Sequence, residues 1–200
     1  HGVEIAAWAV LVRMLSDLSV KHLTLFSVFS SLMILFGFIN DGLKQGVTAL
    51  AANSLGAKKI KDVYKLFKYG LFFQVLLCLL LMIPLVFFAE ESINLLGDFS
   101  SLPELIEPMK KGLLLLLLFI FFDGLVWILA GIMTAGGDTK VIMFINVFSA
   151  WGLVVFPVWL FLVRGSSPAW YVYFFPPLYA FLNSIFHFIR FNKAVWTQKV

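Results

Sequence analysis

One acidic residue lies in the middle of a long apolar run. In residues 112–137, GLLLLLLFIFFDGLVWILAGIMTAGG, Asp123 is the only charged residue. An aspartate at the centre of a membrane helix costs roughly 2.5 to 3.5 kcal/mol on insertion scales, so it is kept where it has a use. Such carboxylates relay protons, coordinate ions or pair with substrates. We therefore predict that Asp123 belongs to a functional site inside a membrane.

A second acidic residue, Glu4, stands in the apolar stretch HGVEIAAWAVL. The chain does not begin with methionine, which suggests that the first helix starts upstream and that Glu4 lies well inside the membrane. If the helix instead begins at His1, Glu4 is an interfacial carboxylate near a helix N-terminus, where the helix dipole favours it. The first interpretation makes Glu4 a second intramembrane acid beside Asp123.

The composition is that of a membrane protein. Hydrophobic residues make up 62% of the 200 residues and charged residues 13%, against about 45–50% apolar residues in soluble domains. The mean hydropathy is +0.98. The net charge of +4 therefore indicates topology and contact with anionic lipids, and no nucleic-acid motif is present. Motifs of membrane enzymes such as HExxH or GxSxG are also absent, which argues against an enzyme.

Six apolar stretches have the roughly 20 residues that a helix needs to cross a membrane. They cover about 1–19, 23–53, 69–88, 112–135, 141–163 and 169–189. We predict an all-α integral membrane protein with these helices in a single lobe. The lysine-rich loop AKKIKDVYKLFK and the basic C-terminal tail should be cytoplasmic, and the acidic loop before residue 112 should lie outside.

Polar residues gather near the end of the second stretch and recur in the last two. The candidates for lining a cavity are Asn40, Asp41, Lys44, Gln45, Asn53, Asn146 and Asn183. Asp41 and Lys44 are three residues apart on a helix and could neutralise each other. The polar half of the second stretch would line a wet cavity or a helix interface, or it would emerge into the headgroups. Gly42 and Gly46 form a GxxxG pattern that permits close helix contact.

Prolines fall inside three of the predicted helices. They are Pro84, Pro157, Pro176 and Pro177. Each lacks a backbone donor and is expected to bend its helix. These bends could be hinges of a transporter or static kinks.

Three motifs resemble the C-terminal six-helix lobe of a multidrug and toxin extrusion (MATE) transporter. Residues 46–59, GVTALAANSLGAKK, are similar to a helix end of the family, with Asn53 at its polar position. FFDGLVWILAGIMTAGGDTK is similar to the family's helix with an acid, a glycine and a GxGDT-like turn. The matching residues after Asp123 are Gly131, Gly136, Gly137, Asp138 and Thr139. Glu4 matches an acidic cation-site position in the lobe's first helix. Phe119, Thr134 and Ala135 depart from the pattern, where some members have a tyrosine and an arginine.

The resemblance implies two parallel six-helix lobes facing each other across a cleft. Residues 1–200 would form one lobe, and the N-terminal lobe and the start of the first helix would lie outside this chain. It implies an antiporter in the cell (inner) membrane that exports small organic cations in exchange for H⁺ or Na⁺. Asp123 and Glu4 would be the coupling carboxylates, Na⁺ being a possible ligand of both, with no other cofactor or metal.

The sequence leaves two other functions possible. A flippase for lipid-linked oligosaccharides or peptidoglycan precursors, from the same superfamily, would need basic residues in the cleft for a pyrophosphate. Lys44 is the one candidate for that role. A helical subunit that only scaffolds a complex would have no need of Asp123 in transport.

Overall fold

The computed structural model describes residues 2–99, 102–165 and 167–199, with side chains up to Thr197. Helices dominate these residues, and no β-strand occurs among them. The α-helices are α1 (Gly2–Leu18), α2 (Val20–Gly56), α3 (Ile60–Met82), α4 (Ala89–Asn94), α5 (Ile106–Ala135), α6 (Thr139–Ala150), α7 (Phe156–Val158) and α8 (Phe175–Asn192). The predicted all-α fold class is confirmed.

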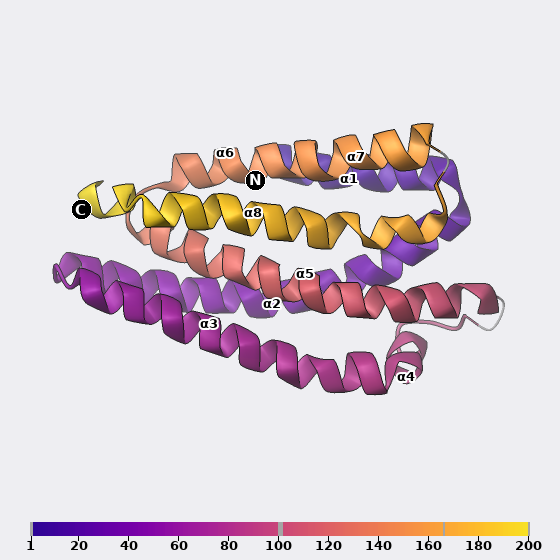
Figure 1. Ribbon diagram of the computed structural model, residues 1–200, viewed down its shortest axis with the longest axis horizontal. Coiled ribbons are helices and arrows are strands. Elements are labelled where there is room, and N and C mark those ends of the chain that lie inside the picture. The colour runs from indigo at the N-terminus through magenta and orange to yellow at the C-terminus, as the bar shows by residue number, and fades with distance from the viewer. Residues whose placement is uncertain (1, 100–101, 166, 200) are drawn as a thin grey trace.

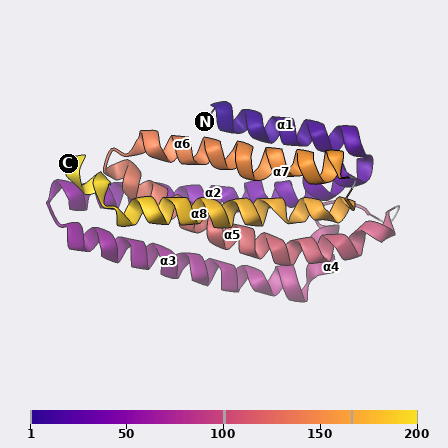
Figure 2. The same cartoon turned by 45° about the horizontal axis from the view of Figure 1, so that its top comes forward.

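The helices form one elongated bundle with α5 inside it (Figure 1; Figure 2). α5 packs against α2, α3 and α8, whereas α1 packs against α2 and α6. Apolar side chains lie on all sides of α5, and Ile120, Ile128 and Leu129 are fully buried, as expected for a helix surrounded by neighbours. Asp123 is therefore carried into the bundle by a helix that packs against several neighbours.

Five helical segments are long and apolar enough to cross a membrane. They are Val20–Gly56, Ile60–Phe87, Pro103–Ala135, Thr139–Arg164 and Ala169–Asn192. They match five of the six predicted spans. The predicted span at residues 1–19 corresponds to α1, whose 17 described residues cover roughly 26 Å at 1.5 Å per residue. α1 alone is thus shorter than the roughly 30 Å hydrocarbon core.

The predicted starts of three helices were too late. The second begins at Val20 rather than 23, α3 at Ile60 rather than 69, and α5 at Ile106 rather than 112. Hydropathy marks the apolar part of a helix, but the backbone hydrogen bonds continue into polar turns. An ion pair from Lys65 to Asp62, 2.8 Å long, supports the first turns of α3.

The prolines are accommodated without breaking the bundle. Pro84 lies in a π-helical segment, Ile83–Phe87, that extends α3. Pro157 lies in α7, between the π-helical segments Trp151–Val155 and Trp159–Arg164. π-Helical turns often occur where the regular backbone hydrogen bonds are interrupted. Pro176 and Pro177 start α8 instead of interrupting it, and the first turn of a helix needs no donor from them.

Close helix contacts use the glycines of α5 and not the GxxxG pattern of α2. A Cβ atom placed on Gly131 would lie 3.0 Å from the Thr48 hydroxyl and 3.1 Å from the Lys44 carbonyl, both on α2. At Gly42 and Gly46, by contrast, an added Cβ atom would meet nothing within 4 Å. The GxxxG pattern thus mediates no close contact among the described residues, whereas Gly131 brings the backbone of Lys44 close to α5.

The lysine-rich turn and the C-terminus lie at the same end of the bundle. The turn between α2 and α3 and the C-terminal end of α8 are both at the left in Figure 1. The turn between α5 and α6 is at this end as well. This agrees with the prediction that the lysine-rich turn and the basic tail face one side of the membrane. The opposite end carries Lys110, which pairs with Glu90 at 2.8 Å and with Glu107 at 3.3 Å.

Candidate functional site

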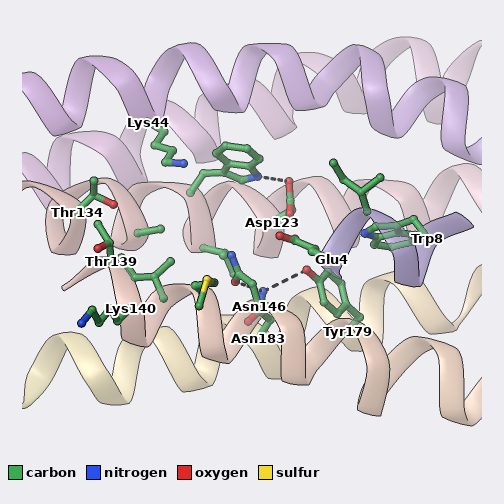
Figure 3. Close-up of a pocket in the computed structure, with 16 residues that line it drawn as sticks. Glu4, Trp8, Lys44, Asp123, Thr134, Thr139, Lys140, Asn146, Tyr179 and Asn183 are labelled. Atoms are coloured by element: carbon green, nitrogen blue, oxygen red, sulfur yellow. Dashed lines mark hydrogen bonds between the residues drawn. The ribbon is translucent and has the colours of Figure 1, made fainter. Parts of the chain in front are cut away.

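A cavity of about 610 Å³ opens among α1, α2, α5, α6 and α8. Its volume falls within the range of roughly 300–1,000 Å³ that is typical of sites for small molecules. Its charged residues are Glu4, Lys44, Asp123 and Lys140, and its aromatic residues are Trp8, Trp127 and Tyr179 (Figure 3). The two acids singled out by the sequence therefore line the same space, although they come from different helices.

Asp123 is held by two hydrogen bonds. The Trp127 Nε1 atom, one turn further along α5, donates to its Oδ2 atom at 2.8 Å. The Asn40 Nδ2 atom, from α2, donates to the same oxygen at 3.2 Å. Both donors suit an ionised carboxylate, which has only acceptors. Asn40 is buried and does not line the cavity, so it acts on the site through Asp123.

Glu4 extends from α1 toward Asp123 (Figure 3). Both carboxylates line the cavity. Trp8, one turn after Glu4, packs edge-on against Tyr179 with 5.7 Å between the ring centres. Glu4 lies in the first turn of α1 and lines the same cavity as Asp123, and its depth in the membrane stays a prediction. One end of the cavity thus combines two carboxylates with aromatic rings, an arrangement that can bind a cation.

Lys44 lies over the indole ring of Trp127. Its Nζ atom is 4.6 Å from the ring centre, within the usual range of a cation–π contact. The expected neutralisation by Asp41 is wrong, because Asp41 instead accepts a hydrogen bond from Gln45 at 2.7 Å. The reason is that the Lys44 side chain turns toward α5, whereas Asp41 and Gln45 pair with each other outside the cavity.

Asn146 and Asn183 form a polar wall between α6 and α8. The Asn183 Nδ2 atom lies 3.4 Å from both the Asn146 Oδ1 atom and the Tyr179 hydroxyl. The Ser149 hydroxyl donates to the Asn183 Oδ1 atom at 3.2 Å. Both asparagines line the cavity, as predicted. Their mutual hydrogen bonds connect the two helices and leave a carbonyl and amide surface that can contact a ligand.

Four of the predicted cavity residues do not line it. They are Asn40, Asp41, Gln45 and Asn53. Gln45 and Asn53 are exposed on α2, which has 37 residues and runs past the cavity toward the lysine-rich turn. A helical repeat places residues on a face but does not determine which neighbour that face meets. Of the predicted residues on α2, only Lys44 lines the cavity, and Asn40 contacts it through Asp123.

A comparison with protein families gives a match to the MatE model over residues 5–160. The matched residues include Lys44, Asp123 and the turn between α5 and α6. The chain belongs to the MatE family. MatE proteins are transporters, and the spanning helices described above agree with a multi-pass membrane protein in contact with the bilayer. A comparison with curated proteins gave no match.

The glycine turn shared with the MatE resemblance ends α5 and starts α6. Gly137 has a φ of +76°, a conformation that glycine adopts without strain. The Gly137 and Asp138 amides donate to the carbonyls of Thr134 and Met133, both at 2.9 Å, which satisfies the end of α5. The turn places Thr139 at the cavity. Gly136 packs so closely on the carbonyl of Trp196 that an added Cβ atom would lie 2.5 Å from it.

Asp138 is held by an arginine that the sequence did not reveal. The Arg190 Nε atom of α8 donates to its Oδ2 atom at 2.6 Å, and the second guanidinium nitrogen donates to Oδ1 at 3.0 Å. The Asp138 side chain is fully buried, whereas that of Arg190 is 21% exposed. In the sequence Arg190 counted only as a positive charge of the tail. In this MatE chain it fixes the turn that borders the cavity.

The sequence also missed several residues of the cavity. Trp127 is not one of them, because it follows Asp123 by four residues and helical spacing predicts its contact with the carboxylate. Lys140 follows the glycine turn directly, and its position could have been inferred from Thr139. Trp8 and Tyr179 carry no such signal, because they reach the cavity from α1 and α8 only when the bundle is packed. Phe119, which departs from the MATE pattern, is buried against Phe29, with 6.2 Å between the ring centres.

Proposed function

We propose that this MatE chain forms the ion-coupling lobe of an antiporter that exports organic cations in exchange for H⁺ or Na⁺. The observation that carries the proposal is the placement of Asp123 and Glu4 on one cavity of about 610 Å³. Two carboxylates in a membrane protein are costly unless they bind something positive. A coupling ion and a cationic substrate are both positive, so they can compete for the same pair.

The exchange follows from this competition. When Asp123 and Glu4 are ionised, the end of the cavity that they line attracts a cation. A proton or a sodium ion that enters from outside neutralises this charge and weakens the hold on the substrate. A positive charge that moves inward through a membrane potential gains about 2.3 kcal/mol per 100 mV. This energy can shift a two-state equilibrium by about fifty-fold, enough to favour release of the substrate outward.

The walls of the cavity suit a flat organic cation. Trp8, Trp127 and Tyr179 present aromatic rings to it. An aromatic face attracts a cation by roughly 0.5–2 kcal/mol, and it also stacks on flat rings. Trp127 both holds Asp123 and lines the cavity. Trp127 can therefore couple binding of the substrate to the charge of the Asp123 carboxylate.

The test is the efflux of ethidium from cells that express the full-length transporter, driven by an imposed pH or sodium gradient. We expect Asp123→Asn to reduce gradient-driven efflux at least roughly tenfold, because an amide neither takes up a proton nor carries the charge that binds Na⁺. The variant should reach the membrane in normal amounts, since an amide can still accept from Trp127 and Asn40.

The matched control is Asp17→Asn. Asp17 is 59% exposed on α1 and pairs with Arg13 at 3.0 Å, so the same change of side chain there should leave efflux unchanged. For the protein without substitutions, the gradient that drives efflux, of pH or of sodium, identifies the coupling ion. Equal efflux by Asp123→Asn and Asp17→Asn, at equal abundance in the membrane, would exclude Asp123 from coupling.

A flippase of lipid-linked oligosaccharides is the second candidate. It is favoured by the lysines of the cavity, Lys44 and Lys140, which could contact a pyrophosphate. The carboxylates of Glu4 and Asp123 oppose this function, because they repel a polyanion in the same space. Translocation of a lipid pyrophosphate by vesicles that contain the protein, without efflux of ethidium, would favour the flippase.

We propose further that the end of the bundle with the lysine-rich turn and the C-terminus is cytoplasmic, in the cell (inner) membrane. Lysines in short turns favour the cytoplasmic side. The cavity would then face an N-terminal lobe of the same polypeptide, as the resemblance to MATE transporters implies. Labelling of a cysteine introduced at Lys59, with a reagent that does not cross membranes, tests the orientation. We expect labelling only after the cells are opened.

A further inference from the structure

Lys44 brings a positive charge to the cavity that we propose to bind cations. It lines the same space as Glu4 and Asp123, and its side chain extends from α2 toward them (Figure 3). An ammonium group in this wall repels any cation that enters, and both are attracted to the same carboxylates. Lys44 therefore opposes the binding of a cationic substrate, which a site built only for tight binding would avoid.

The backbone of Lys44 is held against α5. The Thr48 hydroxyl donates to the Lys44 carbonyl at 2.8 Å and lies 3.2 Å from the Gly131 carbonyl. A Cβ atom on Gly131 would lie 3.1 Å from the Lys44 carbonyl, so the glycine lets the two backbones approach closely. The Lys44 side chain thus starts from a fixed point beside the cavity.

The ammonium group of Lys44 and the carboxylate of Asp123 contact the same indole. The Lys44 Nζ atom is 4.6 Å from the centre of the Trp127 ring. The Trp127 Nε1 atom donates to the Asp123 Oδ2 atom at 2.8 Å. A lysine side chain is a flexible four-carbon stem, so rotation about its bonds can carry the ammonium group from the ring face toward Asp123 while the backbone stays in place.

The ammonium group is not fixed in its position over the ring. In the part of the chain that the structure describes, Lys44 forms no ion pair with a carboxylate within 4.0 Å. Asp41, one turn earlier, is bonded to Gln45 instead. A cation–π contact is modest where water has access, whereas a charge-assisted hydrogen bond to a carboxylate is one of the stronger polar contacts. An ionised Asp123 can therefore attract the ammonium group away from Trp127.

We propose that Lys44 is a tethered competitor of the exported cation, which lowers the affinity of that cation for Asp123 and Glu4 and speeds its release. This inference rests on the proposed function, because it adds a release step to the same cavity. An incoming cation takes the carboxylates and the face of Trp127, and it drives the ammonium group away from both. Once a coupling ion has neutralised the acids, the ammonium group returns to the ring and hinders rebinding of the substrate.

The test is the affinity of the purified full-length transporter for ethidium, measured by fluorescence polarisation at one pH and without sodium. We expect Lys44→Met to bind ethidium on the order of tenfold more tightly, because the competing charge is lost. Methionine keeps an apolar contact with the ring of Trp127. A gain in affinity is informative, since damage to the cavity would weaken binding.

Three further variants make the test specific. Lys44→Arg keeps the positive charge and should bind ethidium as weakly as the protein without substitutions. Lys65→Met removes a lysine that is 63% exposed and paired with Asp62, and it should not change the affinity. In the background of Asp123→Asn, the gain from Lys44→Met should be smaller, because the two cations then compete for one acid fewer.

Three results would overturn the inference. They are an affinity of Lys44→Met equal to or below that of the protein without substitutions, an equal gain in Lys44→Arg, and a gain that is the same with and without Asp123. Kinetics of efflux give an independent measurement. We expect Lys44→Met to lower both the KM and the maximal rate for ethidium, because tighter binding slows release, and a raised KM would contradict the competition.

Failure of this inference can be told apart from failure of the proposed function. If Asp123→Asn abolishes gradient-driven efflux of ethidium while Lys44→Met leaves the affinity unchanged, the transporter is an antiporter without the proposed competitor. If Asp123→Asn leaves efflux unchanged, the proposed function fails, and the inference that rests on it fails as well.

Discussion

Arg190→Met is expected to destabilise the protein by about 3 kcal/mol. The substitution removes the guanidinium group that donates at 2.6 Å and 3.0 Å to Asp138, a carboxylate that is fully buried. Loss of one partner from a buried ion pair typically costs about 3–5 kcal/mol. We expect the lower end of this range because the Arg190 side chain is 21% exposed. The measurement is the midpoint of thermal denaturation of the purified protein in detergent.

The control for this prediction is Lys65→Met. The ion pair between Lys65 and Asp62 is exposed, with 63% and 43% of the side chains accessible, so its loss should cost less than about 1 kcal/mol. A double variant, Arg190→Met with Asp138→Asn, should regain part of the lost stability because it no longer leaves a buried charge. A denaturation midpoint of Arg190→Met equal to that of Lys65→Met would contradict the assignment of a structural role to this pair.

Loss of the ion pair between Arg190 and Asp138 should also affect the cavity, because Asp138 belongs to the turn between α5 and α6. Asp138 precedes Thr139 and Lys140, which line one end of it. Arg190 holds Asp138 against α8, and Trp196 packs on Gly136 of the same turn. Arg190→Met is therefore expected to lower transport as well as stability. The reduction should affect all substrates alike, since neither Asp138 nor Arg190 lines the cavity.

Gly124→Ala is expected to destabilise the protein by about 2 kcal/mol, although alanine usually favours a helix. A Cβ atom on Gly124 would overlap the side-chain amide of Gln74, on α3. Gln74 is fully buried, and its Nε2 atom donates to the Ile120 carbonyl at 2.7 Å. The amide would have to leave this position, and overpacking of a core typically costs about 1–3 kcal/mol. Thermal denaturation in detergent measures the effect.

Removal of the Gln74 amide should relieve this strain. We expect the double variant Gly124→Ala with Gln74→Ala to be more stable than Gly124→Ala alone, because the added methyl group then occupies vacated space. Gly42→Ala is the matched control, since a Cβ atom there meets nothing within 4 Å. It should be neutral or stabilising by up to about 1 kcal/mol, the helix preference for alanine over glycine. Equal effects of Gly124→Ala and Gly42→Ala would show that α3 and α5 do not pack as described.

The sequence predicted the helices better than their ends. The apolar part of each span could be identified because about 20 consecutive residues must match the membrane. The start of α3 could not, because Lys61, Lys65 and Lys68 continue the helix beyond the apolar part. The prolines show a similar limit. Pro84 and Pro176 both appeared to interrupt helices, but one lies in a π-helical segment and the other starts α8.

The candidate site was predicted in part. Asp123 could be identified from its isolation in an apolar run, and the structure places Glu4 on the same cavity. Asn146 and Asn183 were also predicted to line it, and they do. The prediction was wrong for Asn40, Asp41, Gln45 and Asn53, because the sequence determines neither how far along α2 the cavity extends nor which residues of α2 face it. The role of each of these residues in transport stays a prediction.

The sequence by itself determined that this is an all-α membrane protein with an intramembrane aspartate and a glycine turn of the MatE type. These features depend on composition and on the spacing of residues along a single helix, and both can be read from the sequence. The tertiary structure alone decided that Lys44 faces Trp127 instead of Asp41, and that Arg190 pairs with Asp138. Such contacts depend on the rotation and packing of helices that are far apart in the chain. Long, flexible lysine and arginine side chains can reach several partners, and only the packed bundle selects one of them.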